Sequence, residues 1–164
     1  MSAEAVTRTE KDKILLKLGD CALTILPQFG GKVASILVNG QELLQPPLLP
    51  YAPRTRTMGF NEGDASGWDE CLPTVSGCTL ETVNGPVSVP DHGDLWREEW
   101  KVVTGGNGSL TLSAECFSLP LKLVRATTLT RTEKGYRIQA DYTLTNISGK
   151  ETKALAKRPG PSPS

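Results

Sequence analysis

Strict alternation of apolar and polar residues is the feature that most constrains this chain. It runs for ten residues, 136–145, and its apolar members are Tyr136, Ile138, Ala140, Tyr142 and Leu144. Successive side chains of a β-strand point to opposite faces, so this pattern is typical of a sheet with one buried and one wet face. An amphipathic helix needs apolar residues three and four positions apart, and no stretch of the sequence has that spacing convincingly.

Shorter apolar runs predict further strands. Their turns are rich in glycine, and Asn39-Gly40 is the clearest, because Asn-Gly between two apolar runs is the strongest short hairpin signal. We expect these strands at 13–18, 21–26, 33–38, 42–44, 96–102, 110–116 and 121–130. Many short strands at close spacing are typical of a sandwich or barrel. The sequence therefore predicts an all-β fold, an antiparallel β-sandwich.

Two stretches do not look like strands. Residues 45–53 hold four prolines and must form an extended loop, since proline cannot donate to a strand ladder. Residues 54–73 hold Gly59, Gly63, Gly67 and Trp68 and predict a long loop. A loop of that length inside a compact domain is usually functional.

The length of 164 residues suits one domain. We place it at 1–155, because three prolines in the last six residues prevent residues 156–164 from continuing a sheet. That tail has two interpretations. It is either an ordinary disordered terminus or a foreign ending, introduced by a frameshift that cut the chain short.

Charge and cysteine usage exclude several classes of protein. The 18 basic and 18 acidic residues cancel, so there is no electrostatic reason to bind nucleic acid or an anionic membrane. No apolar run approaches the ~20 residues that span a bilayer, and residues 1–13 do not form a secretory signal. We therefore expect a cytoplasmic protein. The cysteines lack C-x-x-C spacing and are expected to be free, small buried hydrophobes: Cys21, Cys71, Cys78 and Cys116.

The single histidine is the first candidate for chemistry. His92 lies in a polar turn between Asp91 and Gly93, and an imidazole suits proton transfer near neutral pH. Trp96, four residues on, supplies a flat apolar face of the kind that packs on a sugar ring. The alternatives are a surface histidine and a turn in which Asp91 or Asp94 caps backbone amides. We expect no metal site, since a second imidazole is missing.

The second candidate is the acidic pair Asp69-Glu70, which follows Trp68. Adjacent side chains of an extended chain point opposite ways, so we expect one carboxylate to face a pocket and the other to face solvent. The carboxylate in the pocket would accept hydrogen bonds from sugar hydroxyls. The alternative is a solvated loop anchored by Trp68.

Three segments together resemble the N-terminal half of the aldose 1-epimerase (galactose mutarotase-like) family. They are Gly30–Ile36 with Asn39–Leu44, then Gly67–Thr74, then His92-Gly93 with Trp96-Arg97 and Trp100. The resemblance covers about residues 14–155. It implies a partial antiparallel β-supersandwich and a family activity, without a cofactor, that interconverts the anomers of an aldose. In that reaction a carboxylate removes the proton of the anomeric hydroxyl, a histidine protonates the ring oxygen, and the ring opens and recloses.

The resemblance also implies roles for residues of this chain. His92 is similar to the family's first histidine, which contacts the sugar near its ring oxygen, and is the expected catalytic residue. Asp69 and Glu70 would bind hydroxyls. Trp68 or Trp96 would pack on the ring, and Arg97 would hold a carboxylate or another oxygen of the substrate.

The sequence departs from the family at two essential points. The family's second histidine should follow the strand that ends near Thr145-Asn146, and its base glutamate should lie further on; neither has a counterpart here. We therefore interpret the chain as a truncated copy, inactive alone, whose exposed sheet edges favour self-association. One alternative is a non-catalytic carbohydrate-binding β-sandwich. The other is a structural fragment without a ligand.

Overall fold

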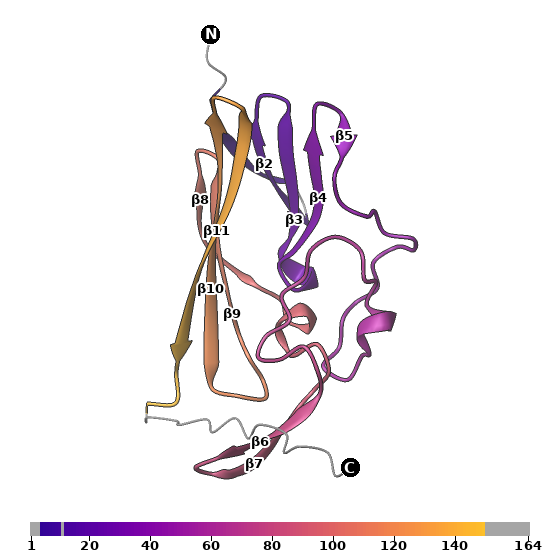
Figure 1. Ribbon diagram of the computed structural model, residues 1–164, viewed down its shortest axis with the longest axis vertical. Helices are drawn as coiled ribbons and strands as arrows, with labels where there is room; N and C mark the ends of the chain where they lie inside the picture. The colour runs from indigo at the N-terminus through magenta and orange to yellow at the C-terminus, as the bar shows by residue number, and fades with distance from the viewer. Residues whose placement is uncertain (1–3, 11, 150–164) are drawn as a thin grey trace, which may run out of the picture.

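The computed structural model describes residues 4–10 and 12–149. This part of the chain contains eleven β-strands, three single-turn 3-10 helices and no α-helix (Figure 1). The strands form a five-stranded sheet in the order β1-β2-β3-β4-β5, a four-stranded sheet in the order β11-β10-β9-β8, and the hairpin β6-β7. Every strand pairing is antiparallel. The predicted all-β fold is confirmed.

The strands are β1 (Val6–Glu10), β2 (Lys13–Leu18), β3 (Cys21–Leu26), β4 (Lys32–Val38), β5 (Gln41–Glu42), β6 (Cys78–Thr82), β7 (Gly85–Val89), β8 (Lys101–Gly106), β9 (Ser109–Glu115), β10 (Leu121–Thr132) and β11 (Gly135–Asn146). The 3-10 helices are η1 (Pro27–Phe29), η2 (Phe60–Glu62) and η3 (Leu95–Arg97). No helix in the described ranges is long and apolar enough to cross a membrane. The predicted tail, 156–164, and the predicted end of the domain at residue 155 lie outside the described residues.

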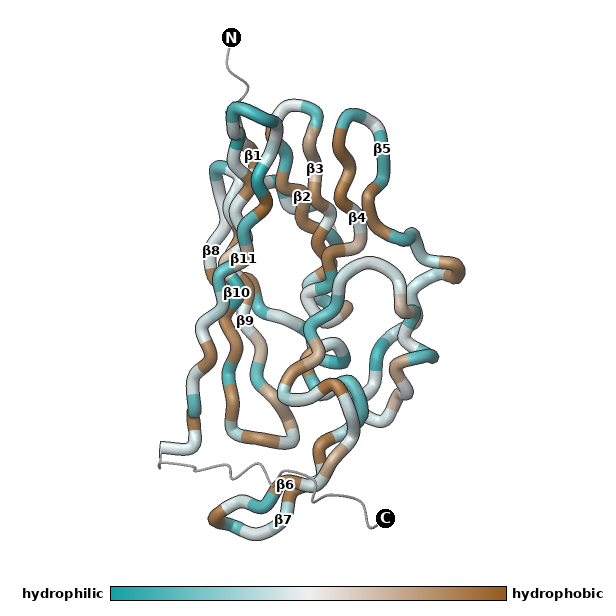
Figure 2. Tube along the Cα trace, in the orientation of Figure 1, coloured by the Kyte–Doolittle hydropathy of each residue, from teal (hydrophilic) through white to brown (hydrophobic). Residues whose placement is uncertain are grey.

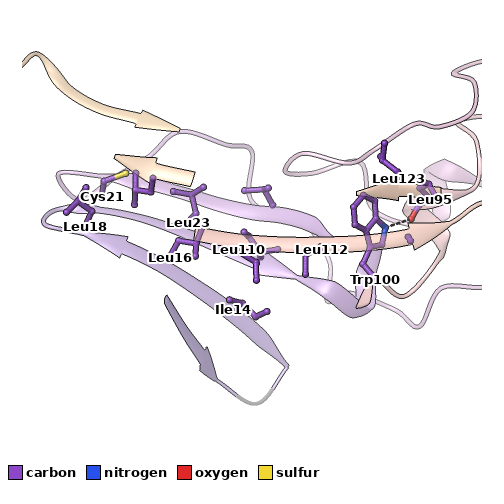
Figure 3. Packing of buried hydrophobic residues seen from close by; sticks show 14 residues of the cluster. Ile14, Leu16, Leu18, Cys21, Leu23, Leu95, Trp100, Leu110, Leu112 and Leu123 are labelled. Carbon is purple, nitrogen blue, oxygen red and sulfur yellow. Dashed lines mark hydrogen bonds between the residues drawn. The ribbon is translucent and has the colours of Figure 1, made fainter. Parts of the chain in front are cut away.

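The two larger sheets bury one apolar core between them. Leu16 of β2 and Leu23 of β3 belong to the same buried cluster as Leu110 and Leu112 of β9 (Figure 3). The hydrophobic stretches of the five-stranded sheet run along β2, β3 and β4 (Figure 2). Trp100 closes one end of the core, where its indole nitrogen donates a hydrogen bond to the carbonyl oxygen of Leu95 over 3.0 Å.

The Asn39-Gly40 turn forms as predicted, with positive φ at both residues, but the strand after it is shorter than expected. β5 ends at Glu42 instead of continuing to residue 44. The carboxylate of Glu42 accepts the backbone N–H groups of Ile36 (2.9 Å) and Leu44 (3.0 Å). The N–H of Leu43 still donates to the carbonyl oxygen of Ile36 (2.9 Å), but Glu42 takes the N–H of Ile36 that would return the bond in a longer ladder, so the strand stops.

The predicted strand at 96–102 is wrong in its first half. Residues 95–97 form η3, and β8 begins only at Lys101. The turn is held by local bonds, from the N–H of Arg97 to the carbonyl of Asp94 (3.0 Å) and from the N–H of Glu98 to that of Leu95 (3.3 Å). Trp96 and Trp100 are both buried, but Trp96 lies in η3 and Trp100 lies in the connection before β8, so their spacing imitated a strand. β1 and the hairpin β6-β7 were not predicted.

β11 follows the predicted alternation, but its apolar face is covered over only part of its length. Tyr136 and Ile138 pack against the core. Tyr142 and Leu144, further along the same face, are 46% and 53% exposed. The five-stranded sheet lies beside the half of β10 and β11 nearest their turn, which leaves the other half of this face open (Figure 1).

Candidate functional site

The three segments that resemble the aldose 1-epimerase family meet in space. Val33 of β4 and Trp68 exchange two backbone hydrogen bonds of 3.0 and 2.9 Å. The carbonyl oxygen of Leu72 accepts the N–H groups of Asp94 (2.7 Å) and Leu95 (3.4 Å). The N–H of Gly30 reaches the carbonyl oxygen of Glu98 at 3.0 Å. Backbone bonds thus join segments that are far apart in the sequence.

Two glycines permit this close packing. Gly67 has a φ of +66°, and an added Cβ would lie 2.6 Å from the carbonyl oxygen of Val33. Gly93 has a φ of +69°, and an added Cβ would overlap the backbone of Leu72. A larger residue at either place would separate the segments, so these glycines position the site.

Asp69 is the anion of a buried cluster. Its side chain is only 6% exposed and lies 2.6 Å from the ammonium of Lys32 and 3.3 Å from the guanidinium of Arg54, both of which are also buried. Lys32 further donates to the carbonyl oxygen of Ser66. Opposite charges at these distances satisfy one another. Asp69 therefore holds the long loop against β4 and offers no open oxygen to a ligand.

Glu70 points to a different group of partners, as expected for neighbours on an extended chain. Its Oε1 accepts hydrogen bonds from Nη1 of Arg125 (2.9 Å) and from the hydroxyl of Tyr142 (2.7 Å). Glu70 is the more exposed carboxylate of the pair, but it does not face solvent freely as expected, because its side chain is only 14% exposed. Burial and the hydrogen bond to Glu70 raise the pKa of Tyr142 above its ordinary value.

Arg125 organises this second cluster and was not predicted. Its side chain is fully buried in β10, with the guanidinium 5.1 Å from the ring of Trp100 and 5.7 Å from that of Trp68. It also donates to the carbonyl oxygen of Gly31. The sequence did hold a signal, since Arg125 occupies an inward position between Leu123 and Thr127 where an apolar side chain is expected.

His92 forms a separate, half-exposed group. Its ring stacks on Phe60 at 4.0 Å between centroids, with an angle of 1° between the planes. Its Nδ1 lies 2.6 Å from a carboxylate oxygen of Asp91, and this hydrogen bond lowers the pKa of Asp91. The backbone of His92 has a φ of 59°. Among the described residues, no hydrogen bond or ring contact joins His92 to Glu70.

Trp96 and Arg97 belong to the scaffold beneath the site. Trp96 is fully buried, with Arg97 at 4.2 Å from its ring and Arg54 at 5.1 Å. Arg97 donates to the carbonyl oxygens of Met58 (2.9 Å), Asp91 and Gly93. Burial lowers its pKa. The expected contacts of Trp96 and Arg97 with a sugar do not fit this arrangement, because Trp96 is fully buried and Arg97 donates to backbone carbonyl oxygens of the protein. Of the predicted aromatic contacts, Trp68 alone is partly exposed.

The four cysteines are free thiols and differ in exposure. Cys21 is buried as expected, Cys71 and Cys116 are half-buried, and Cys78 is exposed, contrary to the expectation. Burial raises the pKa of Cys116 to about 12. No group of three or more metal-ligating side chains was found in the part of the chain that the structure describes.

The largely apolar groove over the outer side of the five-stranded sheet is separate from these groups. It has a volume of about 450 Å³ and is lined by Leu26, Phe29, Ala34, Pro47 and Tyr51, among others. None of the predicted site residues lines it. The candidate site is instead the exposed surface beside Glu70, Arg125 and Tyr142, and the segment that holds His92 is bonded through Asp94 and Leu95 to Leu72 of the same loop.

Fold and site together define an antiparallel β-sandwich with a polar and aromatic site on the open part of one sheet. No family model, no curated protein and no solved structure matches this chain. The resemblance to the aldose 1-epimerase family therefore stays a prediction.

Proposed function

We propose that this chain is an aldose 1-epimerase-like protein that binds an aldopyranose beside Glu70 and Tyr142. One observation carries the proposal. The segments 67–74 and 92–100, which resemble the family independently, are bonded to each other and lie next to an open, partly aromatic surface. A shared sugar site requires these segments to converge in this way.

The geometry suits a sugar hydroxyl and a sugar face. Arg125 and Tyr142 both bind Oε1 of Glu70, which leaves Oε2 to accept a hydrogen bond from a hydroxyl. The half-exposed ring of Tyr142 supplies an apolar surface beside that oxygen. An aromatic face next to a fixed carboxylate is a combination that binds both the C–H and the O–H groups of a pyranose.

Proton transfer would fall to His92. Its Nδ1 is engaged by Asp91, so Nε2 is the nitrogen that would protonate a ring oxygen. The carboxylate of Asp91 holds the ring in orientation. The opposing base is the weak point, because the carboxylates of Asp69 and Glu70 are both already engaged by cations of the protein. We therefore expect binding with little or no catalysis by this chain alone.

That pairing of both carboxylates also favours a second candidate, a non-catalytic carbohydrate-binding sandwich. The two candidates differ in the part that His92 plays. In an epimerase-like site, His92 and Glu70 contact one ligand. In a simple binding surface, Glu70 and Tyr142 suffice.

Tryptophan fluorescence during titration with glucose and with galactose tests both candidates. Trp68 is the reporter, and Glu70→Gln, Tyr142→Phe and His92→Ala are the variants, with the exposed Glu81→Gln on β6 as the matched control. Loss of the signal in all three variants supports the epimerase-like site, whereas loss in only the first two favours the simple binding surface. A flat titration of the native chain with both sugars rejects both candidates. Polarimetry of freshly dissolved α-glucose should show no acceleration, and an acceleration that His92→Ala abolishes would overturn the expectation of inactivity.

A further inference from the structure

β11 is a long strand at the edge of the four-stranded sheet. It is the terminal strand of its sheet, and its register with β10 is unbroken over twelve residues. Within the described residues no other strand pairs with its outer edge. Natural edge strands are usually protected by proline, lysine, a bulge or a short length. β11 is long and has no proline, lysine or bulge, and its charged side chains are the oppositely charged Arg137 and Asp141.

The direction of the backbone groups follows from one printed bond. The N–H of Ile147 donates to the carbonyl oxygen of Pro120 over 2.8 Å and continues the β10-β11 ladder. Backbone groups alternate in direction along an antiparallel pair. The backbone N–H and C=O groups of odd-numbered residues of β11 therefore point toward β10. Those of even-numbered residues, such as Ile138, Ala140 and Tyr142, point to the outer edge.

The side chains of β11 complement themselves in one register. Centred on Gln139, an antiparallel second copy sets Arg137 opposite the partner's Asp141, and two-fold symmetry forms this pair twice. Ile138 then lies opposite the partner's Ala140, and both residues use outward backbone groups. A register centred on Asp141 would instead oppose two like charges, which is destabilising.

Side chains on the apolar face of β11 also favour this register. It places Tyr142, which is 46% exposed, opposite the partner's Tyr136 on the inner face. Aromatic pairs that lie directly across an antiparallel ladder are stabilising. Charge on the outer face and aromatic packing on the inner face thus favour the same pairing.

We propose that two copies of this chain associate through β11, antiparallel and centred on Gln139, and join their four-stranded sheets into one. The partner is a second copy because the strand is complementary to itself, as an isologous interface requires. This inference does not depend on the proposed sugar binding, although both use the exposed ring of Tyr142, so a sugar and the partner chain would compete for that ring.

Sedimentation equilibrium of the full chain tests the proposal, with a dimer expected at twice the 17.6 kDa of one chain. Arg137→Asp opposes two like charges and should raise the dissociation constant roughly tenfold or more. The double variant Arg137→Asp/Asp141→Arg restores complementarity and should restore the dimer. Arg8→Asp, the same change on the edge strand β1, is the matched control and should leave the dimer unchanged.

Ala140→Pro supplies an independent test. It removes an outward N–H and leaves the bonds to β10 in place. The variant should therefore fold, with a circular dichroism spectrum like that of the native chain, but should be a monomer. A monomeric native chain at all concentrations would overturn the proposal. So would a dimer that Arg137→Asp and Ala140→Pro leave intact, or a double variant that fails to associate.

Discussion

Replacing Glu70 with glutamine removes the negative charge that balances Arg125 and leaves the shape of the side chain almost unchanged. Arg125 is fully buried, and its guanidinium bonds only to Glu70 and to the carbonyl oxygen of Gly31 among the described residues. Breaking a buried ion pair by removing one partner costs roughly 3–5 kcal/mol. Because Glu70 is 14% exposed, water can compensate in part, so we expect Glu70→Gln to cost about 3 kcal/mol of unfolding free energy.

Replacing the other partner, Arg125, should lower the free energy of unfolding by less. Arg125→Met removes the buried cation and leaves Glu70, which keeps its bond to Tyr142 and reaches solvent. The double variant Glu70→Gln/Arg125→Met should therefore be more stable than Glu70→Gln alone, since no unpaired charge stays buried.

Urea denaturation measures these differences as changes in the midpoint at constant slope. Glu81→Gln, an exposed residue of β6, is the control for loss of one carboxylate and should stay within about 0.5 kcal/mol of the native chain. If Glu70→Gln is no more harmful than Glu81→Gln, or if the double variant is the least stable of all, Arg125 does not depend on Glu70 for its charge balance.

Three further outcomes can be checked. Burial opposes ionisation of Glu42, but its hydrogen bonds with Ser35 and with backbone N–H groups outweigh this and lower its pKa. The stability that Glu42 gives the β4-β5 turn should therefore be complete above the ordinary pKa of about 4.3 and be lost as pH falls through the lower pKa of the folded state. Hydrogen exchange of the turn as a function of pH measures this loss, and unchanged protection at pH 3 would contradict it. Iodoacetamide at pH 8 should modify Cys78 well before Cys116, whose pKa is about 12, and mass spectrometry of the digested protein would reveal the opposite order. Gly93→Ala should lower the free energy of unfolding by roughly 3 kcal/mol, because it adds overlap with backbone atoms to an unfavourable φ. Gly40→Ala, with the same sign of φ and open space around it, should lower it by only about 1 kcal/mol. Equal shifts of the melting temperature would show that the overlap at Gly93 has no effect.

Much of the fold could be predicted from the sequence because its signals are local. Alternation along β11 and the Asn39-Gly40 turn depend on neighbouring residues, so these elements were predicted nearly to their ends. The turn at 95–97 could not be predicted, because tertiary packing buries Trp96 between two arginines and overrides the strand-like spacing. β6 and β7 are short and half-polar, and their sequences carry little signal that distinguishes a strand from a loop.

The candidate site was predicted less well, for a related reason. The backbone convergence of the segments around Trp68 and His92 depends on contacts across the fold that no single segment encodes. Arg125 could have been found as a charge on a buried face, but its partner Glu70 was visible only once β10 and the long loop lay together. Trp96 was predicted to contact a ligand because it is aromatic, and only its burial reassigns it to the scaffold.

The left-handed backbone at His92 has a consequence for engineering this protein. Glycine adopts that conformation at no steric cost, whereas an L-residue with a Cβ loses about 1–2 kcal/mol there. Position 92 is thus a place where the main chain prefers glycine and the proposed proton transfer needs histidine. A screen that selects variants only for heat resistance should drift toward glycine at this position, and would discard the imidazole as it improved the protein.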